Sequence, residues 1–311
     1  MHSSNNRGMR DWMIFILVAE TGSLSRAAKA LGVSVAAVSK SVSRLENFVS
    51  ASLIRRDSRK LELTCAGQTA YWRAKDITAA FNALLSDLRN PGCDISGQIR
   101  LSAPALMCEF LANYWVIDYA KMHPETKVIL SSREGSEFDR NSPEFDDLVF
   151  KSGFIDSEEL IHRRLNPVKL LLCASPDYLR NHKEITHPAE LKAHLLLGII
   201  HPWLSQAAIL TNDSESFTLT MNHHSGLLSN SVFALLNLLL NGEGGVMILP
   251  AWLAKNYVQA GQLEVVLPQW KIPDMPVYLV WRHRKFYSPL FRDFARIIEE
   301  RWNQTDQELP V

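Results

Sequence analysis

The segment Ser23–Glu46 reads SLSRAAKALGVSVAAVSKSVSRLE, and the spacing of its apolar residues predicts two short helices. Ser23 is placed to cap the first helix, and Gly32 predicts its end. The apolar positions of this helix are Leu24, Ala27, Ala28 and Leu31. Ser34 is placed to cap the second helix, which carries one apolar stripe expected to be buried. The stripe consists of Val35, Val38, Val42, Leu45 and Val49.

Two short helices joined by a tight glycine-containing turn form a helix-turn-helix, which lays its second helix in the major groove of DNA. The outward face of the second helix carries small, hydroxyl and basic side chains, namely Ala36, Ser39, Lys40, Ser43 and Arg44. Small residues allow close approach to the groove, hydroxyls bond to phosphates or base edges, and cations attract phosphates. An ordinary solvated helix face is the alternative for two helices taken alone.

A basic hairpin is predicted after the second helix. Leu53–Leu63 reads as two short strands about a turn. The basic residues near its tip are Arg55, Arg56, Arg59 and Lys60. A wing of this kind meets phosphates or an adjacent minor groove, and it adds salt-dependent affinity more than sequence choice. A hairpin that only improves solubility is the alternative.

Two further helices complete the N-terminal part. Asp11–Glu20 is expected to pack beneath the helix-turn-helix through Trp12, Phe15, Ile16 and Ala19. Thr64 is placed to cap a long helix over residues 68–90, which Pro91-Gly92 ends. Its apolar positions follow a heptad seam of Ala70, Ala74, Ile77, Phe81, Leu84 and Leu88. We expect this helix to form a homodimer that reads a near-palindromic site, with packing against its own domain as the alternative.

The pattern changes after the hinge at residues 91–97. Strand-like segments at residues 98–103, 127–131, 148–151 and 168–174 alternate with helical segments such as 105–122 and the helix that begins at Pro176. Alternation of this kind predicts an α/β domain with mostly parallel strands. The length from Gly97 to Trp302 fits two lobes.

An ordered series of short motifs resembles the LysR-type transcriptional regulators. The N-terminal motifs are Phe15, Val18, residues 19–23, Ala27-Ala28, residues 31–34, residues 37–39, Leu45-Glu46, Arg56 and residues 63–67. Weaker motifs continue the resemblance through residues 146–149, 156–160, 164–165, 174–179, 188–194, 242–250 and 261–268. Three departures from the family pattern stand out. Val35 replaces a frequent Gln and suits contact with a thymine methyl, Val49-Ser50 replaces a Leu-Gly turn, and Lys151 replaces an Arg.

The resemblance implies an α+β multi-domain protein. Its expected parts are a winged helix-turn-helix over residues 9–67, a dimerising linker helix and hinge over residues 68–92, and an effector domain over residues 93–302. The effector domain is expected to be a two-lobed α/β structure like periplasmic binding proteins. Lobe 1 covers about 97–166 and 268–302, lobe 2 covers about 167–267, and the chain crosses near residues 166–172 and 265–270. Arg26, Ser34 and Val35 join the expected DNA contacts.

A small-molecule effector is expected in the cleft between the lobes, because ligands of open α/β sheets bind beyond the carboxyl ends of strands. The candidate residues of lobe 1 are Ser102, Ala103, Pro104, Ser131, Ser132, Lys151 and Gly153. Those of lobe 2 are His201, Trp203, Ser229 and Asn230. Ser102, Ser132 and Asn230 suit a carboxylate or hydroxyl, Lys151 an anion, and Trp203 a ring, so an organic acid or aromatic compound is expected. A solvated Lys151 and a core Trp203 are the alternatives.

Charge is distributed unevenly along a chain of 311 residues with formal net charge zero. Residues 1–92 hold 13 Lys and Arg against 7 Asp and Glu, a balance of +6, and residues 93–311 hold 20 against 26, a balance of −6. A basic N-terminal part suits phosphate binding. The start MHSSNNRGMRD is polar and the apolar run near Val232–Leu240 is too short to cross a bilayer, so we expect a cytoplasmic protein without a membrane partner.

No cofactor, metal site or enzymatic motif is expected. Cys65, Cys93, Cys108 and Cys173 are widely spaced, which favours ordinary thiols, with a redox-sensing cysteine as the alternative. His223-His224, His283 and the basic run at residues 282–285 lack a metal-ligand pattern.

The expected partners are double-stranded promoter DNA, a small-molecule effector, further copies of the chain as a homodimer or homotetramer, and RNA polymerase. Two rivals remain: an enzyme or binding protein that the winged helix only assembles, and an architectural repressor with a ligand-unresponsive C-terminal domain.

Overall fold

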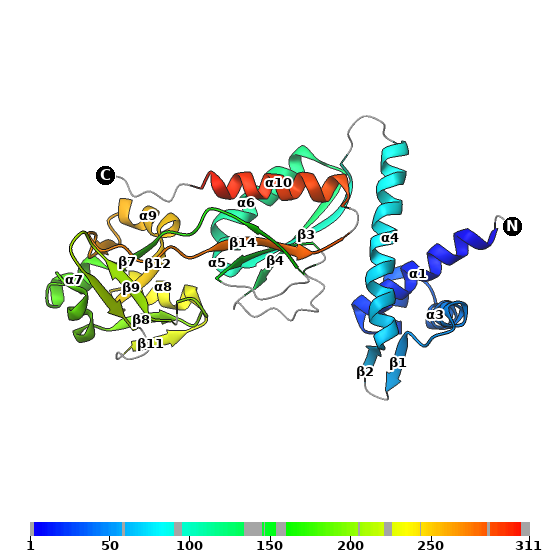
Figure 1. Cartoon of the computed structure of the whole chain (residues 1–311), viewed down its shortest axis with the longest axis horizontal. Helices are drawn as coiled ribbons and strands as arrows, with labels where there is room; N and C mark the ends of the chain where they lie inside the picture. Colours follow the sequence, from blue (N-terminus) through cyan, green and yellow to red (C-terminus); the bar gives the residue numbers. More distant parts are fainter. Residues whose placement is uncertain are drawn as a thin grey trace. The chain divides into compact units, whose positions relative to one another are not determined.

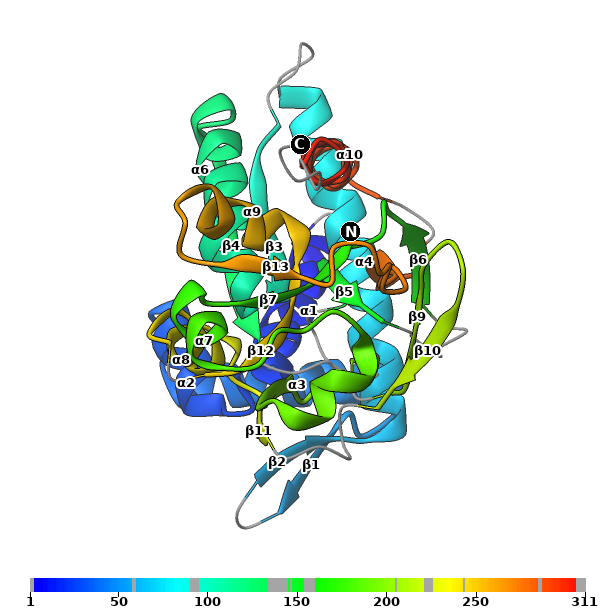
Figure 2. The same ribbon diagram turned by 90° about the vertical axis from the view of Figure 1, so that its left-hand side faces the viewer.

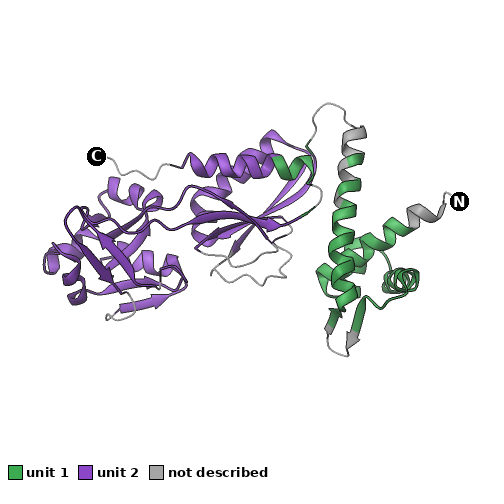
Figure 3. Ribbon diagram, viewed as in Figure 1, with its two compact units in different colours: residues 1–95, 284–292 green, residues 96–283, 293–311 purple. Residues whose placement is uncertain are grey.

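The computed structural model describes residues 3–57, 60–89, 95–133, 145, 147–153, 160–204, 206–220, 226–242, 244–284 and 287–305. It divides into two compact units, which Figure 3 shows in different colours. Unit 1 comprises Met1–Ile95 with Arg284–Arg292, and unit 2 comprises Ser96–His283 with Asp293–Val311. Each unit contains its own cluster of buried apolar side chains.

Unit 1 is a three-helix core followed by a hairpin and a long helix (Figure 1). Its elements are α1 (Ser3–Thr21), α2 (Leu24–Leu31), α3 (Val35–Val49), β1 (Ile54–Asp57), β2 (Lys60–Leu63) and α4 (Cys65–Arg89). Helix α1 begins eight residues before the predicted start at Asp11. The polar segment that precedes Asp11 is helical although it has no apolar periodicity, which explains why the pattern did not reveal it.

Polar caps define the helix ends, as predicted. Ser23 Oγ accepts a hydrogen bond from the backbone N–H of Arg26, and Gly32 ends α2 with a φ of 65°. Ser34 Oγ accepts from the N–H of Ala37, 3.2 Å away, at the start of α3. Thr64 Oγ1 accepts from the N–H of Gly67 at 2.9 Å. These side chains satisfy N–H groups that a helix leaves unpaired in its first turn.

The apolar stripes are buried except where the two helices meet. Phe15, Val18 and Val38 are fully buried in a core that α1, α2 and α3 share. Leu31 is 42% exposed and Val35 is 45% exposed, so the expectation that Val35 belongs to the buried stripe of the second helix is wrong. Both lie at helix ends beside the turn, and periodicity alone does not indicate where cover by a neighbouring helix stops.

The predicted hairpin is confirmed. Strands β1 and β2 pair antiparallel from Ile54↔Leu63 to Asp57↔Lys60, and the hairpin extends beyond the helices of unit 1 (Figure 2). Ser50, which stands where the family often has glycine, takes the left-handed conformation at φ 53°. The glycine-like turn therefore forms with a serine, and the strain of a side chain at this φ remains in the fold.

Helix α4 divides the predicted heptad seam into a covered and an exposed part. Ala74 is 4% exposed, and Ala70 packs against the core of unit 1. These two residues therefore pack against their own domain, which was the alternative to dimerisation. Ile77, Phe81 and Leu84 are 59%, 41% and 52% exposed. The side chain of Leu88 and the hinge at residues 91–92 lie outside the described residues.

Unit 2 contains two five-stranded sheets, one in each lobe. The first has the order β4 (Thr126–Arg133), β3 (Gly97–Pro104), β5 (Leu148–Ser152), β14 (Val277–Arg282) and β6 (Leu160–Arg164). The second has the order β11 (Gly226–Ser229), β8 (Leu196–Ile199), β12 (Val246–Pro250), β7 (Leu170–Ala174) and β13 (Glu264–Val266). A separate ribbon pairs β9 (Ala208–Thr211) with β10 (Ser216–Leu219).

Four strands of each sheet run in one direction and one strand is reversed, so the expectation of mostly parallel strands is confirmed with one exception in each sheet. β3 runs parallel to β4 and β5, and β8 runs parallel to β11 and β12. β14 is antiparallel to β5 and β6, and β7 is antiparallel to β12 and β13. β7 and β14 are the strands that follow the two crossings between the lobes, so each enters its sheet in the reverse direction. The crossing segments themselves pair at Val168↔Met275.

Helices cover the sheets of both lobes. In lobe 1, α5 (Ala105–Met107), a π-helical turn (Cys108–Ala112) and α6 (Asn113–Met122) follow β3, and α10 (Pro289–Asn303) lies across the same sheet (Figure 1). Phe150 of the sheet packs on Trp302 of α10, with ring centroids 4.7 Å apart. In lobe 2 the helices are α7 (Pro176–Asn181), a 3-10 helix (Pro188–Ala193), α8 (Val232–Leu240) and α9 (Ala251–Gln259).

Candidate DNA interface and effector cleft

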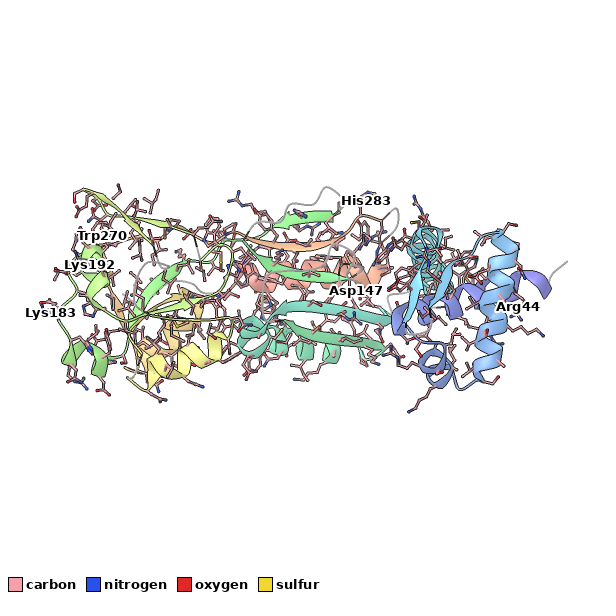
Figure 4. The ribbon with its side chains drawn as sticks, turned by 90° about the horizontal axis from the view of Figure 1, so that it is seen from below. Arg44, Asp147, Lys183, Lys192, Trp270 and His283 are labelled. Carbon is pink, nitrogen blue, oxygen red and sulfur yellow. The ribbon has the colours of Figure 1, made fainter. Side chains whose placement is uncertain are left out.

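The predicted DNA-reading face of α3 separates into a centre and two flanks. Residues advance by about 100° each around a helix, so Ala36, Lys40 and Ser43 lie opposite the buried Val38 and Val42. All three are exposed, as the prediction requires. Ser39 lies on one flank and is partly buried, and Arg44 lies on the other flank, towards α1 (Figure 4).

Arg44 is bound by a carboxylate that the sequence did not reveal. Its Nη2 lies 2.7 Å from Oδ1 of Asp11 and its Nε lies 3.1 Å from Oδ2. The hydroxyl of Ser41, which is 1% exposed, also donates to Asp11. The three residues join α1 to α3, so Arg44 is not a free side chain available to any base it meets.

The Asp11 carboxylate is ionised in this network. Its burial raises its pKa, but the hydrogen bonds from Arg44 and Ser41 and the positive charges of Arg44 and Arg10 outweigh burial. The result is a pKa of Asp11 below its ordinary value. The same contact raises the pKa of Arg44, because the carboxylate stabilises its charged form.

The wing is attached to the recognition helix through Glu46. Its Oε1 accepts hydrogen bonds from the backbone N–H groups of Leu53 at 2.8 Å and of Ile54 at 3.1 Å. This contact fixes the first wing strand at its base. Arg26 and Arg55 are exposed. The side chains of Arg56 and Lys60 and all of Arg59 lie outside the described residues.

Ser102 marks the buried end of the predicted effector cleft in lobe 1. It is fully buried in β3, and its Oγ has no hydrogen-bond partner among the described residues. In register it pairs with Ser131 of β4 and Val149 of β5. Ala103 is fully buried, Pro104 and Ser131 are partly buried, and Ser132 is exposed. An unpaired buried hydroxyl is costly unless another group satisfies it.

The end of β5 and the loop after β8 bring four residues together. Gly153 takes a φ of 79°, and a Cβ at this position would lie 3.4 Å from Cε1 of His201 and 3.6 Å from Cβ of Trp203. Ser152 Oγ lies 3.1 Å from Nε2 of His201, which joins the lobes directly. Gly153, His201 and Trp203 were predicted, and Ser152 was missed although it follows Lys151 in the sequence.

The hydrogen bonds of His201 fix its tautomer. Its Nδ1 accepts from the backbone N–H of Trp203 at 3.2 Å, so in the neutral ring Nε2 carries the proton and donates to Ser152. Burial lowers the pKa of His201, and the positive charge of Lys151 lowers it further. The neutral ring therefore offers a hydrogen-bond donor at the junction of the lobes.

The remaining predicted cleft residues support this junction from lobe 2. The backbone carbonyl of Ser229 accepts from Ile200, the residue before His201, and Ser229 Oγ accepts from the N–H of Ser231. Asn230 is exposed. Phe110 of the π-helical turn stacks on Phe233 of α8 across the lobes, with centroids 6.2 Å apart, and neither was predicted. Their wide separation in the sequence carried no signal.

The described residues contain no cluster of three or more potential metal ligands. Cys65 is exposed, while burial raises the pKa of Cys108 to about 11 and that of Cys173 to about 12, so both buried thiols stay protonated. His283 is exposed, and Cys93, His223-His224 and Lys285 lie outside the described residues. No helix in the described part of the chain is long and apolar enough to cross a membrane.

Two protein families match consecutive parts of the chain. Residues 9–68 match the bacterial regulatory helix-turn-helix proteins of the lysR family, and residues 94–303 match the LysR substrate binding domain. The probable HTH-type transcriptional regulator SinR of Salmonella typhimurium is 52% identical over 307 residues, which cover 99% of this chain and 98% of that protein. The HTH-type transcriptional regulator PtxR of Pseudomonas aeruginosa is 25% identical over 95% of this chain and 93% of its own length.

Solved structures agree with this assignment. CrgA, a LysR-type transcriptional regulator from Neisseria meningitidis, matches with a TM-score of 0.56 and 27% identity over 94% of this chain and 98% of its own. A full-length OxyR variant from Pseudomonas aeruginosa matches in fold with a TM-score of 0.67 at 15% identity, over 97% of this chain and 98% of its own. The chain belongs to the LysR family of DNA-binding transcriptional regulators, with a helix-turn-helix and an effector-binding regulatory domain.

Proposed function

We propose that a homodimer of this regulator, or a tetramer of two dimers, holds promoter DNA through the centre of α3 and through the wing. Residues 9–67 read the DNA, residues 68–92 pair two copies, and residues 93–302 bind the effector. Exposed Ala36, Lys40 and Ser43 support the reading role, because small side chains and one cation suit close approach to the major groove. The exposed side chains of Ile77, Phe81 and Leu84 on α4 support dimerisation.

An organic anion is the proposed effector. The orphaned hydroxyl of Ser102, the Nε2–H of His201 and the positive charge of Lys151 supply two hydrogen-bonding groups and a cation suited to a carboxylate. Such a ligand takes the hydrogen bond that Ser152 now receives from His201. It shifts the arrangement of the lobes only if it binds one arrangement better than the other. The single observation that carries the proposal is the unpaired, fully buried Ser102 Oγ at a strand end.

A gel-shift with the intergenic DNA beside the gene tests the reading role. Lys40→Ala should weaken binding about tenfold, because the variant lacks the cation at the centre of the exposed face. Lys183→Ala, which removes an exposed cation from lobe 2 (Figure 4), is the matched control and should leave binding unchanged. Equal binding by wild type and Lys40→Ala would contradict the proposed reading face.

Titration with small carboxylates tests the effector site. We expect a carboxylate that binds the regulatory unit to change the DNA affinity or the footprint of the full chain, and Ser102→Ala to weaken the response with little loss of stability. Carboxylates that bind wild type and Ser102→Ala equally would contradict the assigned site.

A further inference from the structure

A pocket between α1 and α3 is not explained by base reading from the centre of α3. Its volume is about 460 Å³. Its floor is apolar and consists of Met13, Ile14, Leu31, Val33 and Ala37. Met13 and Leu31 are 48% and 42% exposed, so the pocket is accessible from the surface of unit 1.

Three cations line the same pocket. Arg10 comes from α1, and Lys40 and Arg44 come from α3. Asp11, which is 7% exposed and paired with Arg44, is the one acidic residue among the described residues that line the pocket, so this lining has an excess of two positive charges. A partner with apolar faces and regularly spaced negative charges fits this combination. The sugar–phosphate backbone of DNA has both, since deoxyribose rings offer apolar faces between successive phosphates.

The position of the pocket fits the same partner. A helix with its side chains is about 10–12 Å wide and the major groove is about 12 Å wide, so a helix that reads bases from its centre has a phosphate backbone along each flank. Ala37 and Arg44 lie on the flank of α3 that faces α1. A backbone strand on that flank would meet α1 as well, at Arg10 and Met13.

Arg44 is held in a fixed orientation by Asp11. Asp11 occupies its Nε and Nη2, and Nη1 has no hydrogen-bond partner among the described residues. Asp11 occupies the Nε–Nη2 edge, so the Nη1–Nη2 edge of the fixed guanidinium faces the DNA partner. The position of Arg44 on the flank of α3, beside the apolar lining of the pocket, favours a phosphate oxygen as the acceptor over a base edge.

We propose that the pocket between α1 and α3 binds the sugar–phosphate backbone of one operator strand, with Arg10 and Arg44 on phosphates and the apolar floor against deoxyribose. Asp11 is a positioning residue that holds Arg44 in place. This inference rests on the proposed DNA-reading function, and it makes the expected charge contact of Arg44 specific by assigning it to one strand of the phosphate backbone. It also adds Arg10, which the sequence pattern did not indicate.

The salt dependence of DNA affinity tests the proposal with the full chain. A plot of the logarithm of the DNA association constant against the logarithm of the salt concentration has a negative slope. Each lost phosphate contact makes this slope less steep by about 0.9. Arg10→Ala and Arg44→Ala should each show this decrease on the operator and on a scrambled duplex, with the ratio of the two affinities unchanged. Lys183→Ala should keep the wild-type slope. Unchanged slopes in both arginine variants, or a base preference altered by Arg44→Ala, would overturn the proposal.

Operators with one neutral methylphosphonate linkage locate the contact. Certain linkages should weaken wild-type binding, and the same linkages should cause no further loss with Arg10→Ala or Arg44→Ala. Asp11→Asn should make the salt dependence of DNA affinity less steep, as Arg44→Ala does. The double variant Asp11→Asn/Arg44→Ala should lose no more DNA affinity than either single variant. A thermal unfolding scan of Asp11→Asn shows whether the protein remains folded, and Arg10→Ala, whose side chain is exposed, tests the contact without this risk.

The methyl resonance of Met13 reports on the floor of the pocket. In protein labelled at methionine methyl groups, with Met13→Leu for assignment, operator DNA should shift the Met13 resonance. An unshifted resonance would mean that DNA leaves the pocket open to another partner, which overturns the proposal. Wild-type protein without salt-dependent affinity for any duplex would instead show that the proposed DNA-reading function itself is wrong.

Discussion

Ser152 Oγ lies 3.1 Å from Nε2 of His201, and this hydrogen bond joins the end of β5 in lobe 1 to the loop after β8 in lobe 2. The backbone N–H of Trp203 fixes the ring in the tautomer that donates from Nε2. The Nε2–H group of His201 that donates to Ser152 is also the group that would donate to a ligand oxygen. The effector proposed above would exchange one hydrogen-bond partner of His201 for another, at little net cost in hydrogen bonds.

The stability of the regulatory unit should fall in mild acid. Burial lowers the pKa values of His162, His194 and His201 from the ordinary 6.5. The unfolded chain then binds more protons than the folded one, so the full stability is present above about pH 6.5 and is lost as pH falls towards the folded pKa values. Calorimetric unfolding at about pH 7.5 and about pH 5 measures this loss.

His201→Gln separates the contribution of His201 from the other two. Glutamine keeps a hydrogen-bond donor for Ser152 and does not titrate, so the variant should lose less stability between these two pH values than wild type. His283→Gln replaces an exposed histidine of the same unit and should behave as wild type. An unchanged pH response in His201→Gln would show that His201 does not titrate between these pH values.

Glu46 should stabilise the wing through its two backbone hydrogen bonds. Glu46→Ala leaves the N–H groups of Leu53 and Ile54 without their acceptor and should cost about 1–2 kcal/mol in unfolding free energy. DNA affinity should fall with it, since the wing loses its attachment to α3. Urea unfolding and gel-shift measure the two effects. Glu46→Gln keeps an acceptor oxygen, and a loss as large as that of the alanine variant would contradict this account.

Ser50 should be a site where glycine stabilises the protein. Its φ of 53° strains any side chain, and glycine has no Cβ to clash with the carbonyl oxygen. Ser50→Gly should therefore raise the unfolding free energy by about 0.5–1 kcal/mol in urea titrations. The same change at Ser43, inside α3, should lower it by about 0.5 kcal/mol. Effects of the same sign at both positions would show that backbone strain is not the cause.

The exposed part of the α4 seam should pair two chains. Phe81→Glu places a charge at the centre of the three exposed apolar residues, and we expect it to shift the protein towards monomer in sedimentation velocity. Gln68→Glu adds the same charge at an exposed position of α4 outside the heptad seam and should leave the association state unchanged. A monomeric wild type, or a Phe81→Glu variant as associated as wild type, would exclude pairing through α4.

Local patterns in the sequence predicted the N-terminal unit well. The capping roles of Ser23, Ser34 and Thr64, the glycine stop at Gly32 and the hairpin after α3 all depend on neighbours within four residues or one turn. Three of the expected effector contacts, Gly153, His201 and Trp203, do come together, and their role in binding stays a prediction. The reversal of β7 and β14 within otherwise parallel sheets was not predicted, because it depends on how the chain crosses between the lobes.

The sequence by itself determined which segments are helices, strands and caps, because those preferences depend on spacing and on nearby backbone groups. Only the tertiary structure decided that Arg44 pairs with Asp11, since Asp11 lies 33 residues away on another helix. It also decided that Ser152 meets His201 across the lobes and that α4 covers Ala74 but leaves Phe81 exposed. Contacts of this kind depend on the packing of whole elements, and periodicity within one element carries no information about them.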